Sequence, residues 1–130
     1  MPTLHTYDYA VIRVVPRVER EEFVNIGVIV SCPSRDFLDA RVVIDDTRLR
    51  ALDSSIDLDV IRAYARSIKA ICDGGPQAGA LARLYQRERF HWLVAPRSTI
   101  IQTSAVHTGK CDDPPKLIEH LVAKMVLAPS

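Results

Sequence analysis

The chain has 130 residues, of which 48% are hydrophobic and 25% are charged, and its formal net charge is +1. This length predicts one domain over residues 1–130, with a core large enough to fold without a metal ion or a disulfide bond. The near-neutral charge argues against a protein whose main task is to bind the phosphate backbone of nucleic acids.

Three β-strands are predicted in the first third of the chain. Residues 7–15 are apolar on both alternating faces apart from Arg13, which is typical of a central strand covered on each side. Residues 23–32 predict a second strand, in which alternate residues from Val24 to Cys32 form an unbroken apolar face. Gly27 in this strand indicates a bulge or the close approach of another backbone or a ligand. Residues 37–44 predict a third strand, paired with the second as a hairpin.

Helices are predicted in the middle of the chain. Thr47 predicts the cap of a short helical turn over residues 47–52. A longer helix begins at Leu58, because its apolar residues recur at spacings of three and four, and it ends at Gly74. Residues 79–86 predict another short helix.

The last third of the chain predicts further strands and one more helix. Residues 90–95 predict a fourth strand that ends at Pro96, and residues 100–101 predict a short strand or a cover for the core. Asp113 followed by Pro114 is typical of a helix start, with Asp113 as its N-cap. We therefore expect an α+β fold, with a mostly antiparallel sheet of four to five strands and two main helices packed on one face.

The expected location is the cytoplasm, without a membrane association. The sequence has no uncharged apolar run of about 18 residues, the length that a membrane-spanning helix needs. The first residues carry Asp8 within an apolar stretch and lack a basic start, which argues against a signal peptide. The three cysteines, Cys32, Cys72 and Cys111, are odd in number and widely spaced, which favours reduced thiols.

A group of hydrogen-bonding side chains follows the predicted strand at residues 90–95, and such strand ends often carry binding sites. A guanidinium can pair with two oxygens of a carboxylate or phosphate, so two arginines and their polar neighbours could form one anion pocket. The alternative is that these arginines form structural ion pairs with acidic side chains. The candidate ligand-binding residues are Arg13, Asn25, Arg97, Ser98, Thr99, Gln102 and His107.

Catalytic and metal sites have little support in the sequence. His107 and Cys111, followed by Asp112 and Asp113, are donors that zinc accepts, but no second ligand pair is present and Asp113 is needed as a helix cap. His91 could act as a general base or be a structural residue. No nucleophile elbow, P-loop or dinucleotide fingerprint occurs. The sequence therefore predicts no metal and no cofactor, and it leaves open whether the protein is an enzyme.

Three blocks carry a family resemblance. They are residues 7–30, YDYAVIRVVPRVEREEFVNIGVIV; residues 48–53, RLRALD; and residues 89–109, RFHWLVAPRSTIIQTSAVHTG. Together they resemble the bacterial domain-of-unknown-function family 3037 over nearly the whole chain. The resemblance implies no activity and no catalytic residues. Members of this family resemble small proteins encoded beside a HipA-like kinase domain, which implies an accessory or regulatory role.

Two functions follow as expectations. The favoured one is a non-enzymatic module that binds a protein partner, either a HipA-like kinase or a second copy of the chain. The alternative is a small-anion or nucleotide-phosphate site, catalytic or not, built from the candidate residues. That alternative requires Arg13 and Arg97 to lie in one cleft. Nucleic-acid binding is the least supported, since the sequence has no aromatic-basic RNA motif.

Overall fold

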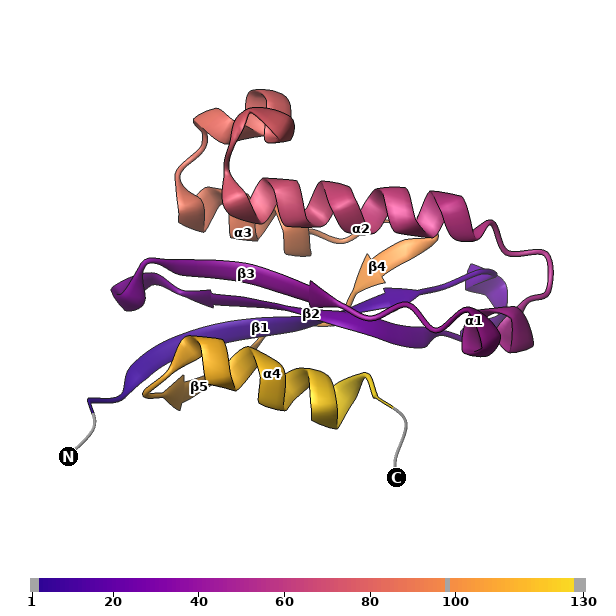
Figure 1. Ribbon diagram of the computed structural model, residues 1–130, viewed down its shortest axis with the longest axis horizontal. Coiled ribbons are helices and arrows are strands. Elements are labelled where there is room, and N and C mark those ends of the chain that lie inside the picture. The colour runs from indigo at the N-terminus through magenta and orange to yellow at the C-terminus, as the bar shows by residue number, and fades with distance from the viewer. Residues whose placement is uncertain (1–2, 98, 128–130) are drawn as a thin grey trace.

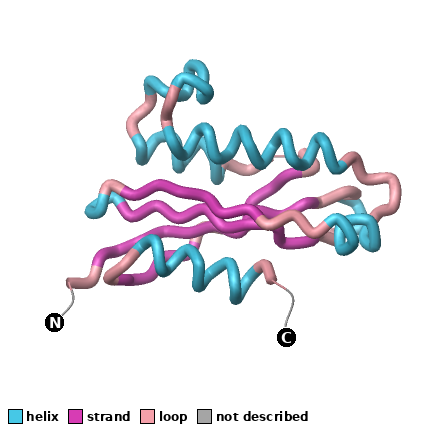
Figure 2. Tube along the Cα trace, viewed as in Figure 1, coloured by secondary structure: helices cyan, strands magenta, loops and turns pink. Residues whose placement is uncertain are grey.

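In the computed structural model, which describes residues 3–97 and 99–127, the strands form one antiparallel sheet between two layers of helices (Figures 1 and 2). Four strands follow the order β3-β2-β1-β4, and β5 also pairs with β1. The α+β class and the antiparallel sheet are confirmed. The strands are β1 (His5–Val14), β2 (Val24–Cys32), β3 (Phe37–Val42), β4 (Ile101–Thr103) and β5 (His107–Cys111).

Helices α2 and α3 share one face of the sheet, and α4 covers the other face (Figure 1). The two main helices predicted from the sequence, α2 and α4, both pack on the sheet, but on opposite faces, and the helix that shares the face of α2 is α3. The helices are α1 (Asp46–Leu52), α2 (Leu58–Asp73), α3 (Gln86–Val94) and α4 (Pro114–Met125), with short 3-10 turns η1 (Val18–Arg20), η2 (Pro33–Arg35) and η3 (Pro76–Arg83).

The chain has two apolar cores, one on each side of the sheet. Ile12 and Val14 of β1 pack with α2 and α3, whereas Val28 and Val30 of β2 pack with α4. Strand β1 is therefore a central strand covered on both faces, as its two apolar faces predict. No described helix has the length and apolarity needed to cross a membrane.

A β-bulge in β2 changes which side its residues face. Ile12 pairs with Gly27 and Arg13 pairs with Asn25, so Ile26 is an extra residue between the two pairs. A Cβ atom on Gly27 would lie 2.6 Å from a backbone carbonyl oxygen of β3. The close backbone approach and the bulge that Gly27 indicated are both confirmed.

The unbroken apolar face predicted along β2 is wrong because of this bulge. Val24 and the bulged residue Ile26 pack on the side of α2. Val28 and Val30, after it, pack on the side of α4. An extra residue in one strand reverses the alternation of side chains, since the period of a strand is two.

The fourth strand predicted at residues 90–95 is also wrong, because residues 90–94 belong to helix α3. The side chain of Glu88 accepts a hydrogen bond from the backbone N–H of Tyr85 at the helix start, 3.0 Å away. The two buried residues of α3, Phe90 and Leu93, are three positions apart, which is helical spacing. The apolar run was too short for its period to be read from the sequence.

Caps and short elements account for the other differences. Asp45, and not Thr47, caps α1, because its side chain accepts from the backbone N–H of Arg48. Asp57 caps α2 and Asp113 caps α4, the latter as predicted. The short strand predicted near residue 100 is β4. Strand β5 was not predicted, because its residues are mostly exposed and show no apolar alternation.

Candidate functional site

The structure separates the predicted ligand-binding residues into groups on opposite faces of the sheet. Ile12 and Val14 face α2, so Arg13 between them faces α4. Arg97 lies on the other side, where its guanidinium donates to the carbonyl oxygen of Leu93 in α3. Arg13 and Arg97 therefore do not share a cleft, and the single anion pocket that combined them is not formed.

On the α4 face, Arg13 and Asn25 are neighbours across two strands. The Arg13 guanidinium lies 4.1 Å from the centre of the Phe23 ring, and the Asn25 amide donates to the carbonyl oxygen of Met125 over 3.1 Å. The Nε of Arg13 and the Oδ1 of Asn25 are buried and have no hydrogen-bond partner among the described residues. A buried donor and acceptor without partners reduce stability. Gln102 is the other cross-strand neighbour of Arg13.

His107 lies apart from both Arg13 and Arg97. It is exposed on β5, and its ring stacks on Tyr9 with centroids 5.3 Å apart. Tyr9 and Arg13 are four residues apart on β1, so about 13 Å separates them along the strand. His91 is on α3, on the opposite face of the sheet from Tyr9. The two histidines and Arg97 therefore do not share one site.

A groove of about 330 Å³ lies between α2, α3 and β4. We call it the Trp92 groove. Three of the seven sequence-predicted residues meet there, because Arg97, Thr99 and Gln102 all line it. Ser98 lies outside the described residues. The groove is also lined by Tyr64 and Ile68 of α2, which are far away in the sequence.

The Trp92 groove is lined mainly by apolar side chains, and two of these side chains are partly exposed to solvent. Trp92 is 43% exposed and Tyr64 is 40% exposed. Large aromatic side chains that remain accessible beside a cavity are typical of binding surfaces, because their burial by a ligand removes much apolar area from water.

Arg97 is held in a defined position at this groove. Its two terminal nitrogens donate to the carbonyl oxygens of Leu93 and Trp92 at the end of α3, where a cation is favourable. Its guanidinium lies 4.1 Å from the centre of the Trp92 ring. Within residues 3–97 and 99–127 it forms no ion pair with a carboxylate. The predicted alternative, a structural ion pair of Arg97, is absent from this part of the chain.

The other polar residues of the groove shape the segment between α3 and β4. The Thr99 hydroxyl donates to the carbonyl oxygen of Ile101 over 2.6 Å, and the Gln102 amide donates to that of Thr99 over 3.0 Å. The Thr103 hydroxyl makes a longer bond of 3.4 Å to Val94. Because these side chains are hydrogen-bonded to backbone carbonyl oxygens, the groove offers a ligand an apolar cavity beside one guanidinium.

Arg89 fixes the distance between the helices that form the groove. Its guanidinium donates to the carbonyl oxygens of Ile71 and Leu84, each over 2.8 Å, and so joins α3 to the end of α2. A Cβ atom on Gly74 would lie 2.8 Å from this guanidinium, and Gly74 has a positive φ of 71°. Glycine is therefore required where α2 ends.

A polar network that sequence reasoning missed holds the start of α3 on the sheet. The Asp8 carboxylate accepts from Arg87 and from Thr108, each over 2.5 Å, and Arg87 also donates to the buried Ser31 over 2.9 Å. Burial alone would raise the pKa of Asp8, but the hydrogen bonds from Thr108 and Arg87 outweigh it, so this pKa lies below its usual value. The sequence signal for this network was the presence of two polar residues, Asp8 and Ser31, in two apolar strands, where they occupy facing positions.

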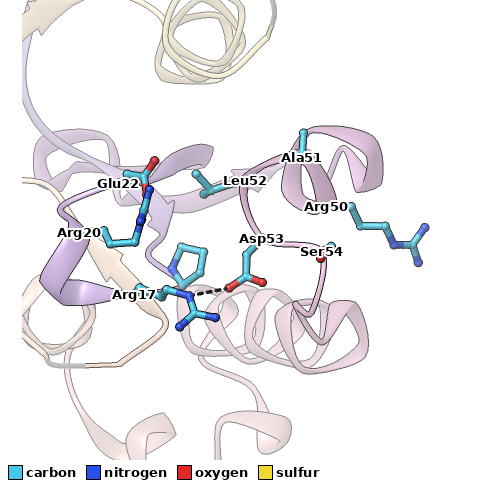
Figure 3. Close-up of a pocket in the computed structure, with 9 residues that line it drawn as sticks. Arg17, Arg20, Glu22, Arg50, Ala51, Leu52, Asp53 and Ser54 are labelled. Carbon is cyan, nitrogen blue, oxygen red and sulfur yellow. Dashed lines mark hydrogen bonds and ion pairs between the residues drawn. The ribbon is translucent and has the colours of Figure 1, made fainter.

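A second cavity, of about 360 Å³, lies between the η1 loop and α1 and is rich in arginine (Figure 3). Arg17 pairs with Asp53 over 3.5 Å, and Arg20 pairs with Glu22. The guanidinium of Arg50 points away from the other labelled side chains (Figure 3). Because two of these charges are paired and one is directed outward, the cavity is a poor match for a bound phosphate.

The cysteines do not form a reactive or metal-binding centre among the described residues. All three are free and buried, and burial raises the pKa of the Cys72 thiol to about 12. The described residues contain no group of three or more histidine, cysteine, aspartate or glutamate side chains arranged to hold a metal ion.

Comparison with protein families matches residues 9–126 to the family described as "Protein of unknown function (DUF3037)". The chain belongs to the DUF3037 family. The match includes Arg13 and the whole Trp92 groove, so the groove is built from the DUF3037 part of the chain. The comparisons with curated proteins and with solved structures gave no match.

Proposed function

We propose that this DUF3037 protein is a non-enzymatic binding module that holds a partner protein in the Trp92 groove. The observation that carries the proposal is the apolar cavity between α2, α3 and β4, with the half-exposed rings of Tyr64 and Trp92 at its walls. Burial of such aromatic rings supplies much of the binding energy at protein interfaces.

The chemistry of the groove supports binding over catalysis. Of the described residues that line it, none is a histidine, cysteine or carboxylate, so its hydroxyl groups have no neighbouring general base. The anion-binding alternative is less well supported. It would need several unpaired arginines together, but Arg13 and Arg97 are on opposite faces and Arg17 and Arg20 have carboxylate partners.

The partner we propose is a HipA-like kinase, on the association that the family resemblance implies, and the role is accessory or regulatory. The interaction would occur in the cytoplasm, where the three free, buried cysteines would remain reduced. Binding to a second copy of the chain is the competing outcome of the test below.

The test is a titration of the purified protein with a purified HipA-like kinase, measured by isothermal titration calorimetry. Trp92→Ala should weaken binding by about tenfold or more, the effect of losing a central aromatic at an interface. Tyr85→Ala is the matched control, because Tyr85 is 82% exposed at the opposite end of α3. The same loss with both variants, or none with Trp92→Ala, would contradict the proposal.

The oligomeric state is measured in parallel by light scattering over a range of concentrations. A dimer that Trp92→Ala dissociates, without any kinase binding, would identify a second copy as the occupant of the groove. A monomer that does not bind the kinase would show that the proposed function is wrong.

A further inference from the structure

We propose that the partner segment bound in the Trp92 groove carries a bulky apolar side chain next to a carboxylate, and that Arg97 recognises this carboxylate. The inference rests on the proposed function and specifies the chemistry of the partner. It follows from three features of Arg97: its position, its unused donors and the absence of a competing charge.

Arg97 is positioned before any partner arrives. Two of its nitrogens donate hydrogen bonds to the carbonyl oxygens of Trp92 and Leu93 in the last turn of α3, and its guanidinium lies over the Trp92 ring. A guanidinium has five N–H donors, and these two bonds leave donors unused. A partner carboxylate would meet a fixed group, so little side-chain entropy is lost on binding.

The described side chains that line the groove carry positive charge only. Arg97 is the only charged side chain among the described residues that line it. No carboxylate of residues 3–97 or 99–127 pairs with it, so a partner carboxylate has no internal competitor there. Next to the apolar walls, the effective dielectric constant is lower than in water, which strengthens the attraction to an anion and penalises a cation.

The volume of the cavity limits the size of the apolar group that the ligand can insert. A volume of about 330 Å³ is at the lower end of the range for small-ligand pockets, which leaves room for one or two apolar side chains. Tyr64 and Ile68 on one side and Trp92 on the other would contact such a side chain. Since Arg97 stacks on Trp92, the carboxylate must be close to the apolar group, as in adjacent residues of one segment.

The single tryptophan of the chain makes a direct test possible, because its fluorescence reports on this groove alone. The probes are acetylated, amidated hexapeptides with the centre Asp-Leu, compared with Asn-Leu, Lys-Leu and Asp-Ala. We expect the Asp-Leu peptide to bind about tenfold more tightly than the Lys-Leu peptide, as charge-assisted hydrogen bonds allow. The Asp-Ala peptide should bind weakly, because it leaves the cavity unfilled.

Substitutions of Arg97 decide whether it is the recognising residue. Arg97→Gln should abolish the preference for Asp-Leu, and Arg97→Glu should reverse it in favour of Lys-Leu. Arg66→Gln is the matched control, because Arg66 is exposed on the side of α2 away from the groove. Thermal melts establish that each variant is folded, and the reversal by Arg97→Glu separates recognition from a structural effect.

The inference and the proposed function can fail separately. Equal binding of the Asp-Leu and Lys-Leu peptides, or a preference that survives in Arg97→Gln, would overturn the inference while a Trp92-dependent kinase complex still supports the function. Octanoate is included as a free acid with an apolar chain. Binding of octanoate without binding of any peptide would overturn the inference in favour of a small-molecule ligand.

Discussion

Replacing Asp8 with asparagine should destabilise the protein by about 2 kcal/mol, the usual contribution of hydrogen bonds to a charged group. The Asp8 side chain is only 15% exposed, and it accepts from both Arg87 and Thr108. An asparagine has one acceptor oxygen where the carboxylate has two, so one of these donors loses its partner. A fully buried pair would lose more, but the Arg87 side chain is 40% exposed and water can solvate it.

The pH dependence of this effect has a defined sign. The pKa of Asp8 is lower in the folded protein than its ordinary value, since the bonds from Thr108 and Arg87 outweigh the effect of burial. The carboxylate therefore contributes stability above its unfolded pKa of about 4, and this contribution is lost as the pH falls through the folded pKa. The wild-type protein should lose more stability than Asp8→Asn in this acidic range.

The assay is urea unfolding followed by circular dichroism, repeated between neutral pH and pH 3. Asp59→Asn is the matched control: the Asp59 side chain is 98% exposed at the start of α2, and its loss should change stability by less than about 0.5 kcal/mol. Equal effects of the two substitutions, or equal pH slopes for wild type and Asp8→Asn, would refute the assigned role of the network.

Three further outcomes are expected. Gly27→Ala should destabilise by more than about 2 kcal/mol in thermal or urea unfolding, because its Cβ would lie 2.6 Å from a backbone oxygen, and a neutral effect would contradict the bulge. Arg13→Met should stabilise by about 1 kcal/mol in the same assay, since it removes a buried donor without a partner among the described residues; a loss of stability would show that the contact with Phe23 dominates. Cys72 should not react with a thiol reagent at pH 8 until the protein unfolds, because its pKa is about 12, and rapid native-state labelling would disprove its burial.

Elements with a long apolar period or an unambiguous cap could be predicted from the sequence. Helix α2 has a stripe of apolar residues over several turns, and helix α4 begins at Pro114, directly after its cap Asp113. The hairpin of β2 and β3 was also predictable, because two alternating runs are joined by a short turn. In each case the local pattern and the tertiary environment favour the same structure.

The candidate site was only partly predictable. Arg97, Thr99 and Gln102 were recognised because they form a polar group after a short apolar run, and they do line the groove. The run itself was assigned to a strand, whereas it is the helix that places Trp92 and Arg97 together. Tyr64 could not have been included, since nothing local indicates that α2 packs beside β4.

The sequence by itself determined that the chain carries an α+β pattern, that β1 has two apolar faces, that an apolar stripe forms the helix from Leu58, and that a cap at Asp113 begins the last helix. These properties depend on nearest neighbours and on side-chain periodicity. Only the tertiary structure decided the side of the sheet on which each residue lies, because one bulged residue reverses the alternation along β2. The same long-range packing placed Arg13 and Arg97 on opposite faces, and it formed the groove from residues that are far apart in the chain.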